Sequence, residues 1–202
     1  CGAAMPQPAP AAAGGYTQCV NCGAVCEHET IDTDGKCTVC GAQAMVAKVG
    51  ETFYSNIQAA LAAAVEEKAT LVLLDDVNLS NFDGYFGSAA GTTIDLNGKT
   101  ITGNALGLNT RTKATLFDSS TEKTGGFGDT VWIAGSCTIL GGNYTTLVIR
   151  KNGSAEIADC KITKAIICEA DSNKQVKNVL KPGYAVYLVD ESDNSAKAVN
   201  AY

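Results

Sequence analysis

The sequence predicts a mainly β protein: a short β-helix (solenoid) with one helix before its first coil and a small metal-binding module near the N-terminus. Three observations predict this fold. A short apolar strand motif recurs at intervals near 20 residues, glycine is abundant with 21 among 202 residues, and two Cys-x-x-Cys pairs lie close together. Such recurrence indicates a solenoid, because each coil can bury its apolar face only when the next coil stacks on it.

Composition and charge narrow the classes of function. With 46% hydrophobic and 18% charged residues, the chain has an ordinary globular composition. The net charge of −6 argues against a nucleic-acid partner, because phosphate binding requires a basic surface. No segment reaches the roughly 18 continuous apolar residues of a membrane span. An acidic balance suits an extracellular protein.

Residues 1–15 form a low-complexity Ala/Pro arm that includes Pro6, Pro8 and Pro10. Such a segment favours extended conformations and buries little surface by itself. It is interpreted either as a spacer from a cell-surface anchor or as an arm that docks on a neighbouring subunit. Cys1 followed by Gly2 resembles the mature end of a bacterial lipoprotein, although it is equally compatible with an arbitrary chain end. Cys1 is therefore a candidate for lipidation or for an intermolecular link.

Residues 16–45 form a cysteine-rich module that resembles a zinc ribbon. Two Cys-x-x-Cys-Gly-Ala knuckles are separated by 14 residues. This spacing is typical of a structural zinc site, because each knuckle directs two thiolates at one ion. The predicted ligands are Cys19, Cys22, Cys37 and Cys40. Cys26 and His28, the only histidine, lie between the knuckles and are alternative ligands. Disulfides in an oxidising compartment, or redox chemistry, are the competing interpretations.

The β-helix domain is predicted over residues 46–190. Residues 46–54 alternate in polarity and predict a first strand. Ser55 or Asn56 can cap a helix that runs through Glu67, with Ile57 and Leu61 on its apolar face. Residues 70–74 are a fully apolar strand that ends at an Asp-Asp pair.

One short strand motif then appears four times, at residues 93–98, 115–118, 138–142 and 156–159. Its apolar centres are Ile94, Leu116, Ile139 and Ile157, at offsets of 22, 23 and 18 residues. Second strands are predicted between them at residues 100–103, 131–133, 147–149 and 161–163. Asn97-Gly98 and Asn152-Gly153 offer corner positions that tolerate positive φ. A β-sandwich of similar short strands is the rival fold.

The chain is predicted to close with a strand within residues 183–189 and a polar C-terminal tail over residues 191–202. Three further cysteines lie in the solenoid, where they pack inside as small apolar side chains or form a disulfide. They are Cys137, Cys160 and Cys168. Their pairing is left open.

Several of these segments resemble a known group of proteins. Residues Val49-Gly-Glu-Thr-Phe-Tyr, Ile94-Asp-Leu-Asn-Gly-Lys-Thr-Ile and Leu180-Lys-Pro-Gly-Tyr-Ala-Val-Tyr are similar to the opening and the close of pectate-lyase-like right-handed β-helix domains on the surfaces of gut Firmicutes. Cys26-Glu-His and Asp34-Gly-Lys-Cys-Thr-Val-Cys-Gly resemble a short zinc-binding repeat of the same extracellular proteins. The resemblance implies a right-handed solenoid and a second ligand set, Cys26, His28, Cys37 and Cys40. We rank the two-knuckle set slightly ahead because of its symmetry.

No catalytic constellation is recognisable from the sequence. Five aspartates at strand ends are candidate acids, but such positions are usually turn formers. They are Asp75, Asp76, Asp95, Asp118 and Asp159. The single histidine lies in the metal module, which excludes a Ser-His-Asp triad in the solenoid. Trp132 and Tyr144 are candidate sugar-binding platforms, although core positions suit them equally.

The sequence therefore predicts a non-enzymatic, extracellular or cell-surface structural protein of bacterial origin. An open solenoid end and an extended arm favour a homo-oligomer or a self-assembling filament. A glycan-binding adhesin module is the alternative, and a polysaccharide lyase-like enzyme ranks third. The only cofactor predicted is structural zinc, and a membrane is expected as a partner only through lipid on Cys1.

Overall fold

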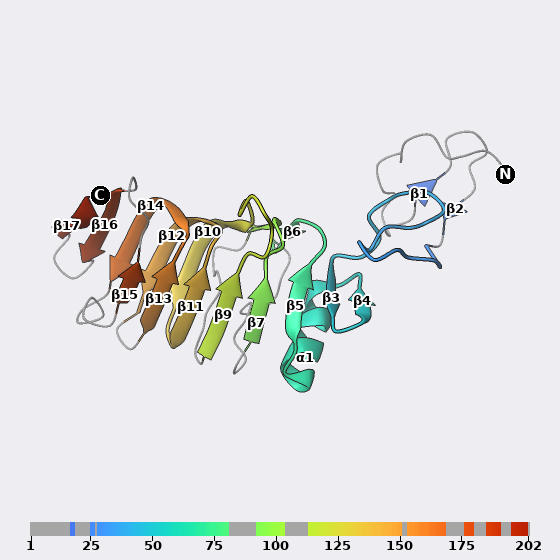
Figure 1. Ribbon diagram of the computed structural model, residues 1–202, viewed down its shortest axis with the longest axis horizontal. Helices are drawn as coiled ribbons and strands as arrows, with labels where there is room; N and C mark the ends of the chain where they lie inside the picture. The colour runs from blue at the N-terminus through green and yellow to red at the C-terminus, as the bar shows by residue number, and fades with distance from the viewer. Residues whose placement is uncertain are drawn as a thin grey trace.

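The protein is a parallel β-solenoid, which confirms the predicted fold class and excludes the β-sandwich. This computed structural model describes side chains in residues 28–80, 92–103, 113–150 and 153–164 and at Ile166. It describes the backbone alone at residues 165, 167 and 168 and in strands β1, β2, β15, β16 and β17. Two sheets face one another along the long axis, with β3, β4 and α1 at one end and β16 and β17 at the other (Figure 1).

The larger sheet has eight strands in the order β15-β13-β11-β9-β7-β5-β3-β4. From β5 to β15, each strand is parallel to the next and is separated from it in sequence by a strand of the other sheet. The strands are β3 (Ala47–Val49), β4 (Thr52–Tyr54), β5 (Thr70–Leu73), β7 (Thr92–Asp95), β9 (Lys113–Phe117), β11 (Ser136–Leu140), β13 (Ser154–Ala158) and β15 (Val176–Val179).

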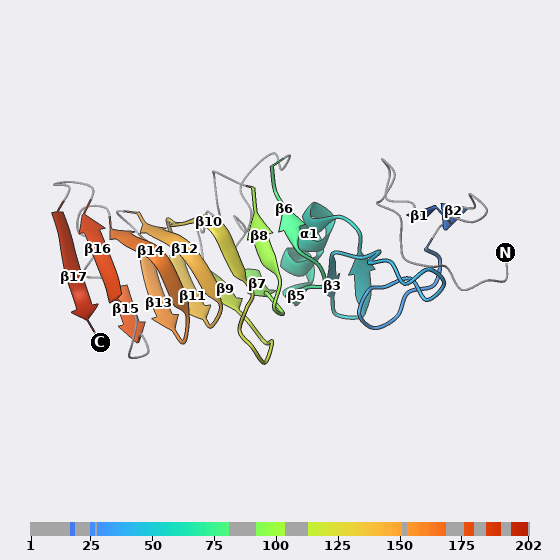
Figure 2. The same cartoon turned by 90° about the horizontal axis from the view of Figure 1, so that it is seen from above.

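The smaller sheet has seven strands in the order β17-β16-β14-β12-β10-β8-β6 and lies opposite the first (Figure 2). Its strands are β6 (Val77–Asn78), β8 (Thr100–Thr102), β10 (Gly126–Ile133), β12 (Asn143–Ile149), β14 (Lys161–Cys168), β16 (Ala185–Asp190) and β17 (Ser195–Ala201). Each successive coil contributes one strand to each sheet, which is the defining connectivity of a solenoid. A separate antiparallel pair, β1 (Thr17–Gln18) and β2 (Val25–Cys26), lies in the cysteine-rich module.

The predicted repeat is confirmed residue by residue in the larger sheet. Ile94 aligns with Leu116, Leu116 with Ile139, and Ile139 with Ile157. All four side chains are fully buried. Because side chains in a strand alternate between the two faces, this column lies inside the solenoid and the neighbouring threonines lie outside.

The predicted second strands are all found, but they occupy two different registers. Ile101, Phe127, Tyr144 and Ile162 form one buried row across the smaller sheet, whereas Val131, Leu147 and Ile166 form another. β10, β12 and β14 contribute to both rows, and between the rows the register shifts, after Phe127 in the β10–β12 pair and after Tyr144 in the β12–β14 pair. At each shift one of the two paired strands contains an extra residue, which bends that strand locally. Short apolar runs in the sequence do not reveal such an extra residue.

At the N-terminal end, the segment predicted as one strand is a hairpin. β3 pairs antiparallel with β4 through a turn in which Gly50 has a φ of 55°. The predicted helix follows as α1 (Ile57–Glu67), and the Asn56 side chain accepts hydrogen bonds from the backbone N–H groups of Gln58 and Ala59. Buried Ala60, Leu61 and Ala64 of α1 join the same core cluster as Leu71 and Ile94. The helix therefore closes this end of the core.

Two predicted glycine corners serve different purposes. Asn97 and Gly98 have φ values of 46° and 75°, as expected for a tight corner. Gly153 does not have a φ in the left-handed region. Instead, a Cβ atom there would lie 2.1 Å from the carbonyl oxygen of Ile133, so the close approach of two coils requires glycine. Asn152 lies outside the described residues.

At the C-terminal end, the predicted closing strand is β16, which runs parallel to β14. The segment predicted as a polar tail contains β17, which pairs antiparallel with β16 and aligns Ala185 with Ala201. The chain thus reverses direction once at this end. β15 and β17 are the last strands of their sheets.

Candidate metal centre

One group of potential metal ligands occurs among the described residues, and it lies in the cysteine-rich module. The ligand atoms of His28, Cys37 and Cys40 all lie within 4.8 Å of one another. The Cys40 Sγ and the His28 Nδ1 are 3.5 Å apart. Ligands of a tetrahedral zinc ion, at bond lengths of about 2.0–2.3 Å, are separated by roughly 3.5–3.8 Å. The group can therefore hold a metal ion.

The second knuckle has the geometry expected of a metal-binding turn. The Gly41 N–H donates to the Cys37 carbonyl at 2.8 Å, and the Cys37 N–H donates to the Ala42 carbonyl at 2.9 Å. Gly41 has a φ of 73°, which a residue with a side chain rarely adopts. This tight reversal brings both thiols to the same side, and both cysteines are buried.

A second turn supports the knuckle from the preceding segment. The carboxylate of Asp32 accepts hydrogen bonds of 2.9 Å from the backbone N–H groups of Asp34 and Lys36. The hydroxyl oxygens of Thr30 and Thr38 are 2.6 Å apart and join the segment after His28 to the knuckle. Short-range polar bonds therefore position the ligands in a segment with few apolar residues.

The module also contacts the first coil of the solenoid. A Cβ atom on Gly35 would lie 2.8 Å from the Leu74 side chain and 3.1 Å from that of Met45. The backbone of Gly35 thus packs directly against Leu74, which is buried at the end of β5. The cysteine-rich module therefore packs against the N-terminal end of the core through Gly35.

The structure brings together residues from both predicted ligand sets. Cys37 and Cys40, common to both predicted sets, lie together, and His28 from the alternative set joins them. Cys26 is the last residue of β2, two positions before His28, and its side chain lies outside the described part. Cys19 and Cys22 also lie outside the described residues. Which residue supplies a fourth ligand stays a prediction.

The candidate catalytic acids mostly accept hydrogen bonds from the backbone. Asp95 accepts hydrogen bonds from the N–H groups of Asn97 and Ser119. The Asp118 carboxylate accepts hydrogen bonds from the backbone N–H groups of Gly98, Ser120 and Gly125. Asp95 and Asp118 are both buried. The Asp76 carboxylate accepts a hydrogen bond from the Thr100 N–H, and the Asp75 carboxylate accepts one from the Asp76 N–H. Asp159 has a φ of 55° at a corner. These bonds join coils and shape turns, in agreement with the structural interpretation.

The solenoid thiols and aromatic residues are also largely internal. Cys137 and Cys160 are buried free cysteines, and burial raises the pKa of each thiol to about 12. Thiols with such a pKa are unreactive near neutrality. The Cys168 side chain lies outside the described part. Tyr144 is 1% exposed, which is incompatible with an open sugar platform. The ring of Trp132 is already in contact with a side chain of this protein, because the Arg150 guanidinium lies 4.2 Å from its centre.

Comparison with models of protein families, with curated proteins and with solved structures found no match to this chain. The structure shows two features that the resemblance implied, a β-solenoid and a His/Cys group that could hold a metal ion, but no family is identified. In the described part of the chain, no helix is long and apolar enough to cross a membrane.

Proposed function

We propose that this protein is a non-enzymatic structural subunit of a bacterial extracellular or cell-surface assembly, in which copies add to one another at the solenoid ends. The observation that carries the proposal is the contrast between the two ends. The N-terminal end of the core is closed by α1, whereas β15 and β17 are the edge strands of their sheets at the other end of the described residues.

Terminal strands favour association because one edge of each presents backbone N–H and C=O groups. A strand from a second copy can satisfy these groups by adding to the sheet. Contact between different ends of successive copies is heterologous, and it produces an open filament when the rotation does not close a ring. The arm at residues 1–15 is the proposed donor segment, and a lipid or intermolecular link on Cys1 would join it to a surface or a neighbour.

The metal centre has a structural role in this proposal, with zinc as the ion. Thiolate and imidazole are the ligand types of structural zinc sites. Metal binding supplies folding free energy to small modules that lack a sufficient apolar core. Since Gly35 packs on Leu74, an ordered module would also stabilise the first coil.

Electron microscopy of the purified protein tests the assembly directly. We expect filaments for the full chain and dispersed particles after deletion of residues 1–15. The deletion should leave the thermal unfolding of the solenoid unchanged, because the core cluster begins at Ala47. Dispersed particles of the full chain at every concentration would refute the proposal.

A pair of proline variants tests the edge of β17. Alternate residues of a strand direct their N–H groups to opposite edges, so Lys197→Pro and Ala198→Pro remove donors from different sides. One variant should lose pairing with β16 and unfold at lower temperature. The other should retain the wild-type melting temperature and fail to extend filaments. Normal filaments in both variants would show that the β17 edge is not the site of addition.

A further inference from the structure

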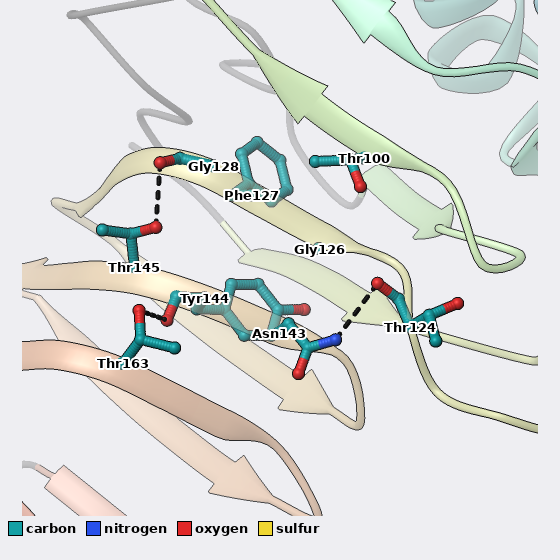
Figure 3. A pocket seen from close by; sticks show the side chains of 9 residues that line it. All are labelled: Thr100, Thr124, Gly126, Phe127, Gly128, Asn143, Tyr144, Thr145 and Thr163. Carbon is teal, nitrogen blue, oxygen red and sulfur yellow. Dashed lines mark hydrogen bonds between the residues drawn. The ribbon is translucent and has the colours of Figure 1, made fainter.

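We propose that a small groove on the outer face of the seven-stranded sheet binds one uncharged sugar ring of a glycan. The groove crosses β8, β10, β12 and β14 (Figure 3). This binding function is separate from the proposed assembly, because the groove lies on a side of the solenoid and not at its ends.

Two glycines of β10 lie in the floor of the groove. Gly126 and Gly128 flank Phe127, whose side chain belongs to the core, so both lie on the outer face. A Cβ atom on Gly126 would collide with the Asn143 carbonyl oxygen, and one on Gly128 would lie 2.8 Å from the Thr102 side chain, so β10 packs closely on its neighbours here and neither residue places a side chain in this gap. Neighbouring strands surround this gap with Thr100 on one side and Asn143 and Thr145 on the other (Figure 3). Thr124 and Thr163 complete the rim.

Three of the rim side chains, those of Asn143, Thr145 and Thr163, already donate hydrogen bonds to backbone carbonyls. The Thr145 hydroxyl donates to the Gly128 carbonyl at 2.8 Å, and the Thr163 hydroxyl to the Tyr144 carbonyl at 3.4 Å. The Asn143 amide nitrogen donates to the Thr124 carbonyl at 3.1 Å. These bonds fix the side chains and leave oxygen lone pairs for a ligand. A complementary ligand must therefore donate several hydrogen bonds, as the hydroxyl groups of a sugar do.

Size and charge restrict the ligand further. The cavity volume is about 130 Å³, whereas pockets for drug-sized molecules occupy about 300–1,000 Å³. A groove of this size admits at most one sugar ring, and the rest of a glycan chain would extend over the open sheet. None of the nine lining residues carries a charge, so neither an acidic sugar nor a polyamine finds a counter-ion there. Threonine methyl groups and glycine backbone offer apolar contact to the C–H groups of a ring.

The experiment is a titration of the folded full chain, followed by NMR chemical shifts and calorimetry. The neutral probes are cellotriose, maltotriose, xylotriose and chitotriose, with trigalacturonate and spermidine as charged comparisons. We expect at least one neutral probe to saturate at millimolar concentration or below, with shifts centred on Gly126, Gly128 and Thr145. The charged probes should not compete.

Matched variants locate the site. Thr145→Val keeps the shape of the side chain, removes the hydroxyl and should weaken binding about tenfold. Thr115→Val makes the same change on the outer face of the opposite sheet and should bind like wild type. Melting temperatures establish that both variants are folded, and a second rim variant, Thr163→Val, replaces Thr145→Val if the latter unfolds. Binding by no neutral probe, binding by the charged probes alone, or undiminished binding by the rim variant would overturn the proposal. None of these results depends on whether filaments form.

Discussion

The carboxylate of Asp118 accepts a 2.9 Å hydrogen bond from the backbone N–H of Gly98, a residue 20 positions earlier on the preceding coil. The same carboxylate accepts bonds from the N–H groups of Ser120 and Gly125. Burial acts to raise the pKa of Asp118, but the hydrogen bonds from Ser120, Gly98 and Gly125 together hold it below its ordinary value. Ionised Asp118 is therefore a link between stacked coils.

This link predicts a loss of stability in acid. A lowered pKa in the folded state contributes stability that is present above the unfolded value of 3.8 and is lost as pH falls through the folded value. We expect Asp118→Asn to lower the free energy of unfolding by about 2–4 kcal/mol at neutral pH, and by less below pH 3.8. Denaturant unfolding across pH measures the difference. Glu156→Gln, on the exposed outer face of β13, is the control, and a pH-independent deficit in Asp118→Asn would contradict the prediction.

Ile139 and Leu140 test the register of the solenoid. Ile139 is fully buried between Leu116 and Ile157, whereas the next side chain, Leu140, is 43% exposed. Removing a buried isoleucine costs about 2–5 kcal/mol, so Ile139→Ala should unfold at much lower denaturant concentration. Leu140→Ala should change the free energy of unfolding by only about 0.5 kcal/mol. Equal costs would mean that β11 does not present alternate residues to the core.

Metal content distinguishes the predicted ligand sets. We expect about one zinc ion per chain by elemental analysis and its loss in Cys40→Ser, because both sets include this thiol. Given the group of His28, Cys37 and Cys40, we expect His28→Ala to lose metal as well. Cys22→Ser and Cys26→Ser then identify the fourth ligand. Retention of zinc in His28→Ala, with loss in Cys22→Ser, would favour the two-knuckle set.

Tyr144 offers a stabilising change. Its hydroxyl is buried and has no hydrogen-bond partner among the described residues, and burial raises its pKa well above the ordinary value. An unsatisfied buried hydroxyl is costly, so Tyr144→Phe should raise the free energy of unfolding by about 1 kcal/mol while the ring keeps its stacking on Phe127. Thermal unfolding measures the change, with half-buried Tyr54→Phe as the comparison. A lower melting temperature would indicate that the hydroxyl has a stabilising partner, such as a buried water molecule.

Much of the fold was predictable because its signals are local. The offsets between Ile94, Leu116, Ile139 and Ile157 are also their pairing register, since a coil of nearly constant length places equivalent residues side by side. The Asn56 cap of α1 depends only on the next residues along the chain. The knuckle at Cys37 and Cys40 was likewise predictable, because the turn between two ligands is a short-range structure.

Other features depend on residues that are distant in sequence. The shift after Phe127 depends on how β10 fits β12, and the role of Gly153 depends on the Ile133 carbonyl of the preceding coil. The groove at Gly126 and Gly128 exists only because threonines of three other strands surround it. Neither hydrophobic period nor residue type carries this information.

The amino-acid sequence alone predicted a solenoid preceded by a Cys/His module that could hold a metal ion, because periodic burial and ligand spacing are properties of the chain read in order. The tertiary structure decided which ligands meet, which aspartates join the coils and where the outer face is hollowed. Those outcomes depend on distances of a few ångströms between separate coils, and such distances are established only when the coils stack.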